Sequence, residues 1–201
     1  MPETKGSRSY VGLKDIVYAV LESDSKDGVS YGPIKNYAPA KTASIAPSST
    51  NNPEYADDGV LDVVSSNGAY TLTLGTAGVD DEVKAEILGA KYKDGVTEYH
   101  KDRVAPFVAI GFRSMKADGN YGYVWLLKGK FSNPSREHNT KEDTATPQTD
   151  TIEGMFIDRK FDGLTMATLD TSKASEEKIN TFFEQVYGAE ASTPSNPPET
   201  D

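Results

Sequence analysis

The fold is decided by residues 106–131, whose sequence is PFVAIGFRSMKADGNYGYVWLLKGKF. The sequence predicts two strands, residues 106–112 and 121–127, with a turn at Ala117-Asp118-Gly119-Asn120. An Asp-Gly pair supplies the positive backbone angles that a tight hairpin turn needs. The segment is therefore predicted to form an antiparallel β-hairpin.

Both faces of this hairpin are apolar. Successive side chains of a strand point to opposite faces, so Val108, Ile110 and Phe112 share one face while Phe107 and Ala109 share the other. The same holds for the second strand. One of its faces carries Tyr121, Tyr123, Trp125 and Leu127, and the other carries Val124 and Leu126. An antiparallel sheet with one solvated face alternates apolar with polar residues. This hairpin is therefore covered on both faces, either by a second layer of its own domain or by another subunit.

The composition limits the possible functions. The chain has 201 residues and no cysteine, which excludes a disulfide framework, a thiolate metal site and a thiol nucleophile. Its 31 Asp and Glu residues against 21 Lys and Arg give a net charge of −10, which repels phosphate backbones and argues against tight nucleic-acid binding. Residues 1–8 lack the apolar run of a secretion signal, and no stretch approaches the length of a membrane span. We expect a soluble protein made in the cytoplasm.

The chain is predicted to be mainly β. Five Asp-Gly dipeptides punctuate it, and several lie between runs of β-branched and aromatic residues. The predicted strands are residues 15–21, 29–36, 60–65, 70–74, 90–94, 96–99, 106–114, 121–131, 150–157 and 165–169. Short strands with turn signals between them indicate an antiparallel β-sandwich or partial barrel.

Two helices interrupt the strands. Residues 80–88 begin with acidic side chains, carry apolar residues on one side and are followed by Gly89, as is typical of a short helix. Residues 173–187 place Ile179, Phe182, Phe183, Val186 and Tyr187 on one helical stripe. We expect this C-terminal amphipathic helix to dock on the open face of a sheet in the same subunit.

The predicted domain spans residues 15–188 and follows an N-terminal arm of residues 1–14. Within it, residues 38–57 contain Pro39, Pro47 and Pro53 and are predicted to form a long loop. Residues 133–148 are polar and also resist regular assignment. Residues 189–201 are rich in Pro, Ser and Glu and are predicted to be a disordered tail.

No catalytic, cofactor-binding or metal site is predicted. His100 and His138 lie beside charged residues in turn-like sequence, without metal-ligand spacing. The acidic run Asp80-Asp81-Glu82 is best explained as a complement to a helix dipole. A hydrolase that uses such surface carboxylates is the least supported function.

Several motifs, taken in order, resemble one family. They are Val11-Gly12-Leu13-Lys14-Asp15-Ile16-Val17-Tyr18-Ala19, Ala56-Asp57-Asp58-Gly59, Pro106-Phe107-Val108-Ala109-Ile110-Gly111-Phe112, Val124-Trp125-Leu126-Leu127-Lys128-Gly129-Lys130-Phe131 and Thr144-Ala145-Thr146-Pro147-Gln148-Thr149. From about residue 10 to residue 169 the chain resembles the major tail (tail tube) protein family of long-tailed, non-contractile bacteriophages. None of these motifs is catalytic, and the resemblance rests on their order and spacing.

The resemblance implies a structural, non-enzymatic virion protein. Its copies would assemble in the host cytoplasm as six-membered rings that stack through loops and arms into the tail tube, with strands of each subunit joining a barrel around a lumen. The implied partners are other copies of the chain, the tape measure protein, and the tail terminator and distal tail proteins. Double-stranded DNA would pass through the lumen transiently, and an acidic wall would keep it from sticking. No membrane is involved.

The apolar hairpin, the loop of residues 38–57 and the N-terminal segment are predicted to make the subunit and ring contacts. The residues predicted for this interface are Tyr10, Leu13, Tyr37, Ile45, Tyr55, Phe107, Ile110, Phe112, Tyr123 and Trp125. An alternative function is an immunoglobulin-like binding module for carbohydrate or protein, in which Tyr121, Tyr123 and Trp125 form an exposed aromatic platform.

Overall fold

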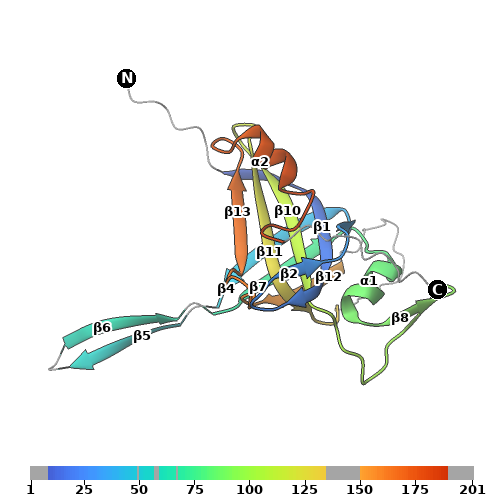
Figure 1. Ribbon diagram of the computed structural model, residues 1–201, viewed down its shortest axis with the longest axis horizontal. Helices are drawn as coiled ribbons and strands as arrows, with labels where there is room; N and C mark the ends of the chain where they lie inside the picture. The colour runs from blue at the N-terminus through green and yellow to red at the C-terminus, as the bar shows by residue number, and fades with distance from the viewer. Residues whose placement is uncertain (1–8, 49, 57–58, 67, 135–149, 190–201) are drawn as a thin grey trace, which may run out of the picture.

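Figure 1 shows the computed structural model of the chain, which describes residues 9–48, 50–56, 59–66, 68–134 and 150–189. The fold is mainly β and antiparallel, as the sequence predicted. The strands are β1 (Tyr10–Asp24), β2 (Val29–Tyr31), β3 (Lys35–Asn36), β4 (Ala40–Pro47), β5 (Thr50–Ala56), β6 (Gly59–Ser66), β7 (Tyr70–Thr76), β8 (Lys91–Lys93), β9 (Val96–Glu98), β10 (Val108–Lys116), β11 (Tyr121–Phe131), β12 (Asp150–Phe156) and β13 (Met166–Asp170). The helices are α1 (Asp81–Leu88) and α2 (Glu176–Thr181).

Most strands belong to one curved sheet with the order β2-β1-β10-β11-β12-β7-β4, in which β3 also pairs with β1 and β13 with β11. The sheet forks at β11, because Gly122 to Leu126 pair with β13 while Gly129 to Phe131 pair with β12. Strands β12, β7 and β4 fold back over the central hairpin, and β4 approaches β1 without pairing to it. The sheet therefore forms a sandwich that is not a closed barrel.

One face of the β10–β11 hairpin lies inside this sandwich. Val108, Ile110 and Leu126 have no exposed surface. They pack with side chains from β7, β12 and α1, namely Leu72, Leu74, Ile152, Phe156, Ile87 and Leu88. Tyr37 stacks on Phe131 with ring centroids 6.3 Å apart and extends this core towards the end of β11.

The opposite face of the hairpin lies beneath the C-terminal residues 176–189, which we call the C-terminal cover. Trp125 is fully buried there, and its indole Nε1 donates a hydrogen bond of 2.8 Å to the carbonyl oxygen of Phe182. The Trp125 ring meets Phe183 edge to face, with centroids 5.4 Å apart. On the sheet side it lies so close to Gly111 that a Cβ there would be 2.8 Å from the ring. Both apolar faces of the hairpin are thus covered by layers of the chain itself.

The C-terminal helix is shorter than predicted. Instead of spanning residues 173–187, α2 ends at Thr181 and the chain continues in turns. The carbonyl oxygen of Phe182 would accept the amide of Val186 in a continuing helix, but it accepts the Trp125 indole instead. The predicted docking on a sheet of the same subunit is confirmed, because Phe182 and Val186 are buried against it.

Helix α1 forms where the sequence predicted it. Asp80 precedes it, Asp81 and Glu82 lie in its first turn, and Gly89 ends it in the left-handed conformation with φ 66°. Ile87 and Leu88 are buried against the sandwich core. The helix therefore covers one side of the sheet and positions the β8–β9 hairpin that follows it.

The prediction of a long loop over residues 38–57 was wrong. Most of that range forms β4 and β5. Proline lacks the amide that a central strand requires but is tolerated on edge strands. Pro47 lies in β4 at the edge of the main sheet, and Pro53 lies in β5, whose one strand partner among the described residues is β6. The β5–β6 hairpin projects from the body as an arm (Figure 1).

The limits of the domain also differ from the prediction. The N-terminal arm was placed at residues 1–14, but β1 begins at Tyr10, so residues 10–14 belong to the main sheet. Residues 1–8, residues 135–149, which include most of the polar segment, and residues 190–201 of the predicted tail lie outside the described residues.

Candidate subunit interface

Half of the ten side chains predicted for subunit contact are buried within the single chain. They are Tyr37, Ile110, Phe112, Tyr123 and Trp125, none of which is more than 7% exposed. Their partners are the sandwich core and the C-terminal cover. The exposed aromatic platform of the alternative function was therefore wrong, because the cover hides Tyr123 and Trp125.

The remaining predicted residues lie nearer the surface. Tyr10 is 63% exposed, and its ring lies over Gly122. Leu13 and Ile45 are half-buried at the margin of the core. Phe107 is also half-buried, and the ammonium groups of Lys128 and Lys130 lie 5.2 Å and 4.5 Å from its ring centre. For Tyr55 the structure describes only the backbone, in β5.

Strand β13 offers the clearest open edge of the sheet. The amide of Leu127 donates to the carbonyl of Thr165 at 2.9 Å, and the amide of Thr171 donates to the carbonyl of Tyr121 at 3.0 Å. Hydrogen-bonded pairs recur every second residue in an antiparallel ladder. The backbone groups of Met166 and Thr168 therefore point away from β11, and no other described strand pairs with them.

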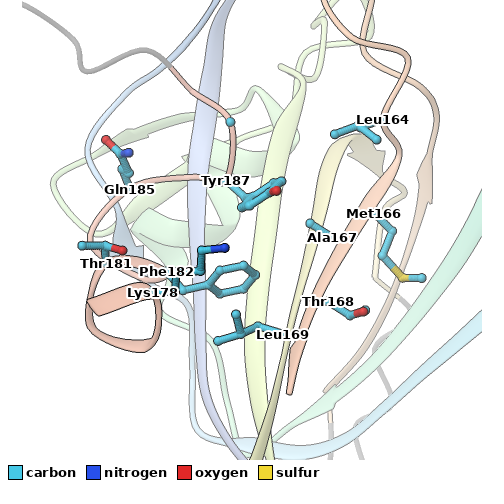
Figure 2. Close-up of a pocket in the computed structure, with 11 residues that line it drawn as sticks. Leu164, Met166, Ala167, Thr168, Leu169, Lys178, Thr181, Phe182, Gln185 and Tyr187 are labelled. Atoms are coloured by element: carbon cyan, nitrogen blue, oxygen red, sulfur yellow. The ribbon is translucent and has the colours of Figure 1, made fainter. Parts of the chain in front are cut away.

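The C-terminal cover overhangs this open edge and makes a slot beside it. Figure 2 shows the side chains that line the slot, and the cavity measures about 580 Å³. Strand β13 contributes both of its faces, and the cover contributes Lys178, Thr181, Phe182 and Gln185. The slot combines unpaired backbone groups with a mixed apolar and polar lining, which suits an added strand better than a small polar ligand.

A second open edge lies on the opposite side of the same sheet. Strand β1 pairs with β10 from Tyr10 to Val20. On its outer side, β3 pairs with Val17 and Tyr18, and β2 pairs from Leu21 onward. The carbonyl of Ile16 accepts the amide of Tyr37 at 2.9 Å, so the stretch without an outer strand in the described part of the chain is residues 10–14. A bulge at Asp15, which has φ 50°, separates this open stretch from the paired one.

The two open edges belong to one four-stranded unit, β1-β10-β11-β13. A single row across it contains Lys14, Arg113, Tyr123 and Leu169. Arg113 is paired with Asp15 at the bulge and lies over the ring of Tyr121. The open stretch of β1 and the open edge of β13 therefore stand at the same level of the sheet.

An almost fully buried arginine fixes the C-terminal cover. Arg159 is 2% exposed and forms an ion pair with Asp162. Its Nη1 donates to the carbonyl of Tyr187 at 2.9 Å. Burial opposes the charge of Arg159, but hydrogen bonds to Asp162 and Tyr31 outweigh it and raise the pKa of the guanidinium. The clamp ties the end of the cover to the segment between β12 and β13.

Two more ion pairs hold the segments around the open edge of β13. Lys128 Nζ lies 2.7 Å from Asp24, and both side chains are buried. Burial raises the pKa of Asp24, but hydrogen bonds from Lys128 and from the amides of Lys160 and Phe161 outweigh it, so the net pKa is lowered. At the end of β13, a hydrogen bond from Lys116 holds the pKa of Asp170 at about 2. These ion pairs therefore fix the segments that flank the open edge of β13.

The described residues contain no group of His, Asp and Glu side chains placed to hold a metal ion. No helix within the described ranges is long and apolar enough to cross a membrane. The features that remain as candidates for function are the two strand edges, the slot and the projecting arm.

Comparison with known proteins identifies the family of the chain. A family model described as phage tail tube protein matches residues 25–192. The chain belongs to the phage tail tube protein family. A search of curated proteins gives no match. The resemblance found in the sequence is confirmed, and this tail tube protein is a structural component of a bacteriophage tail.

Sequence reasoning missed the open edges of this tail tube protein. It predicted the strand at residues 165–169, but nothing in a run of five residues reveals which of its two sides is paired. The exposed Tyr10 and Val11, which begin β1, were placed in an arm. One usable signal was the apolar face that contains Trp125. The C-terminal segment that hides this face also borders β13, the strand at that edge of the sheet.

Proposed function

We propose that copies of this tail tube protein join head to tail through β13 of one copy and the first residues of β1 of the next. The contacts close into rings, with six copies per ring as the family resemblance implies, and the rings stack into the tube. The observation that carries the proposal is the pair of open strand edges on opposite sides of one four-stranded unit. The subunit is structural and not an enzyme.

The strand directions support this contact. Each neighbouring pair in β1-β10-β11-β13 is antiparallel, so β1 and β13 run in opposite directions. Placing β13 beside β1 of the next copy therefore continues the antiparallel alternation without reversing a subunit. A heterologous contact of this kind closes into a ring when its rotation divides a full turn. Closure covers both open edges of this four-stranded unit.

The slot supports the same contact. A strand that pairs with β13 enters beneath Lys178, Thr181 and Gln185 of the cover. Residues 10–14 suit this place, because Gly12 has no side chain to clash with the cover and Lys14 is solvent-exposed in the single chain. Backbone hydrogen bonds supply the attraction, and the cover selects the strand.

The net charge of −10 suits a tube that conducts DNA. Negative charge facing the lumen repels the phosphate backbone and lets the genome pass without sticking. The partners we propose are other copies of the chain, the tape measure protein that occupies the growing tube, and the terminator and distal tail proteins at its two ends. Assembly takes place in the host cytoplasm.

Electron microscopy of the concentrated protein tests the proposal, with rings or tubes as the expected result. The Thr168→Pro variant removes an outward amide of β13 and should abolish tubes, while circular dichroism and melting temperature remain those of a folded monomer. The matched Thr168→Val variant keeps the amide and should form tubes. A wild type that stays monomeric in every condition, including beside the tape measure protein, contradicts the proposal, as does normal tube formation by Thr168→Pro.

A further inference from the structure

The bulge in β1 shifts the register of the residues that precede it. Val17 lies opposite Gly111 of β10, but Lys14 lies opposite Arg113. The chain therefore advances from residue 17 to residue 14 in β1 while it advances only from 111 to 113 in β10, so β1 contains one extra residue. In a ladder without the bulge, Lys14 would lie one residue further along β10, opposite Ser114. The bulge thus decides which partners residues 12–14 have.

A register shift of one residue also exchanges the two faces of a strand. With the bulge, Leu13 lies opposite Ser114 and packs against the sandwich core. Lys14 lies on the other face, opposite Arg113, and is solvent-exposed. Without the bulge, Lys14 would point to the apolar core and Leu13 would leave it. The bulge therefore assigns the apolar side chain to the core and the charged one to the opposite face.

Asp15 is the residue whose backbone makes the extra position possible. Its φ of 50° lies in the left-handed region, where one type of bulge normally has glycine. Asp and Asn occupy this region more readily than other residues with a side chain, whereas a β-branched residue there is an outlier. A substitution of this one side chain can therefore keep the bulge or remove it.

The side chain of Asp15 ties the bulge to the two neighbouring strands. Arg113 of β10 donates to its carboxylate and forms an ion pair with it. The same guanidinium donates from Nη1 to the hydroxyl of Tyr123 at 3.5 Å and lies 5.1 Å from the ring centre of Tyr121. Both tyrosines belong to β11. The position of the bulge along β1 is therefore fixed from β10 and β11.

The choice of face matters because the C-terminal cover lies on one face only. The cover packs on the face of Tyr123, and this face continues across Arg113 to Lys14. A second register shift precedes Gly12, so residues 12–14 are the regular part of the open stretch. In a sheet continued from copy to copy, the cover of one copy overhangs the same face of the next copy's β1. That face presents Gly12 and Lys14, while Leu13 stays in the core of its own subunit.

We propose that Asp15 is the positioning residue of the contact between β1 and β13 of neighbouring copies. Its bulge sets the register in which residues 12–14 meet the cover of the next copy. This inference rests on the proposed function and adds to it the residue that decides which face of β1 is presented. Loss of the bulge would turn Leu13 towards the neighbour's cover and Lys14 towards the core, which should raise the concentration needed for assembly about tenfold or more.

Paired cysteines test the register in the monomer, because the wild-type chain has no cysteine. Directly opposite residues of an antiparallel pair have Cα atoms about 4.5–5.5 Å apart, which a disulfide can span. Leu13→Cys with Ser114→Cys should form an intramolecular disulfide. Lys14→Cys with Ser114→Cys, the pair of the unbulged register, should form little. Adding Asp15→Val should reverse the two results, and adding Asp15→Asn should leave them as they are. Disulfide yields that Asp15→Val does not change overturn the inference.

Assembly, followed by electron microscopy over a concentration series, provides the second measurement. Asp15→Val should need a higher concentration than the wild type, while the matched Asp15→Asn variant should not. Deletion of Asp15 removes the extra residue and leaves Lys14 opposite Arg113 in a regular ladder, so this variant should also assemble.

The possible failures are distinguishable. Asp15→Val that assembles like the wild type overturns the inference while the proposed function stands. Loss of assembly on deletion of Asp15 also overturns it, because the bend of the strand and not its register would then be what the contact needs. A wild type that forms no tube, or a Thr168→Pro variant that forms normal tubes, rejects the proposed function itself.

Discussion

Replacement of Trp125 by alanine should lower the free energy of unfolding by about 3–5 kcal/mol, the range for removal of a large buried aromatic side chain. Trp125 is 0% exposed, and its indole ring fills the space between Gly111 and Phe183. Its Nε1 also satisfies the carbonyl of Phe182, and a buried carbonyl left without a partner costs roughly 1–3 kcal/mol. Trp125→Phe keeps most of the ring volume but loses the donor, so we expect about 2 kcal/mol for it.

Urea unfolding followed by far-ultraviolet circular dichroism measures these changes, since fluorescence is lost with the only tryptophan. Tyr92→Ala is the matched control, because Tyr92 is an exposed aromatic residue of the same protein and its loss should change stability by no more than about 0.5 kcal/mol. In the wild type, Trp125 emission should be blue-shifted and resistant to quenchers. A cost below about 1 kcal/mol for Trp125→Ala, or red-shifted wild-type emission, would refute the covered hairpin.

A double-mutant cycle locates the effect at the contact with Gly111. Gly111→Ala places a Cβ within 2.8 Å of the indole, and overpacking of this kind typically costs about 1–3 kcal/mol. In the Trp125→Ala background the same methyl group enters a cavity, so its cost should fall to near zero or change sign. Strict additivity of the two substitutions would show that the ring does not lie over Gly111.

Three further outcomes follow from the same geometry. The pKa of Asp24 is lowered in the folded protein, so its contribution to the free energy of unfolding is fully present above the unfolded-state pKa of about 3.9. This contribution is lost as pH falls through the folded pKa, and stability should therefore drop below about pH 4. The fall in stability with pH should be smaller in Asp24→Asn. Phe112→Ala should cost about 3–5 kcal/mol in urea unfolding, and a cost under 1 kcal/mol would contradict its burial. Removal of residues 190–201 should leave the melting temperature unchanged, whereas removal of residues 176–201 uncovers Trp125 and should lower it sharply; equal melting temperatures would count against the cover.

The elements that the sequence predicted well have local causes. The β10–β11 hairpin was found because its residues are apolar on both faces and an Asp-Gly turn joins its strands, with Gly119 at φ 85°. Helix α1 was found because acidic residues begin it and Gly89 ends it. In both cases propensity and burial favour the same structure, so no distant contact was needed to decide it.

The elements that were missed depend on contacts between distant residues. Strands β4 and β5 contain Pro47 and Pro53, which argue against a strand unless one knows that both strands lie at an edge. The end of α2 depends on Trp125, more than fifty residues earlier, because its indole takes the carbonyl of Phe182 from the helix. The open edges were missed for a related reason. Whether a strand edge is open depends on which other strands pair with it in the folded sheet, and a strand's own sequence does not show this.

The aromatic face that contains Tyr123 and Trp125 is buried within one chain, so it is not available as a contact between copies. If the hairpin faces were the subunit contact, a free monomer would expose a large apolar surface and aggregate before assembly. Here Arg159 and the C-terminal cover keep that surface inside the monomer, and the open backbone of β13 is only five residues long. Short, partly covered edges are the form in which proteins tolerate unpaired strands without aggregating. Each strand-edge contact of the proposed kind is then weak alone, so the proposed tube would depend on ring closure, in which several such contacts form together.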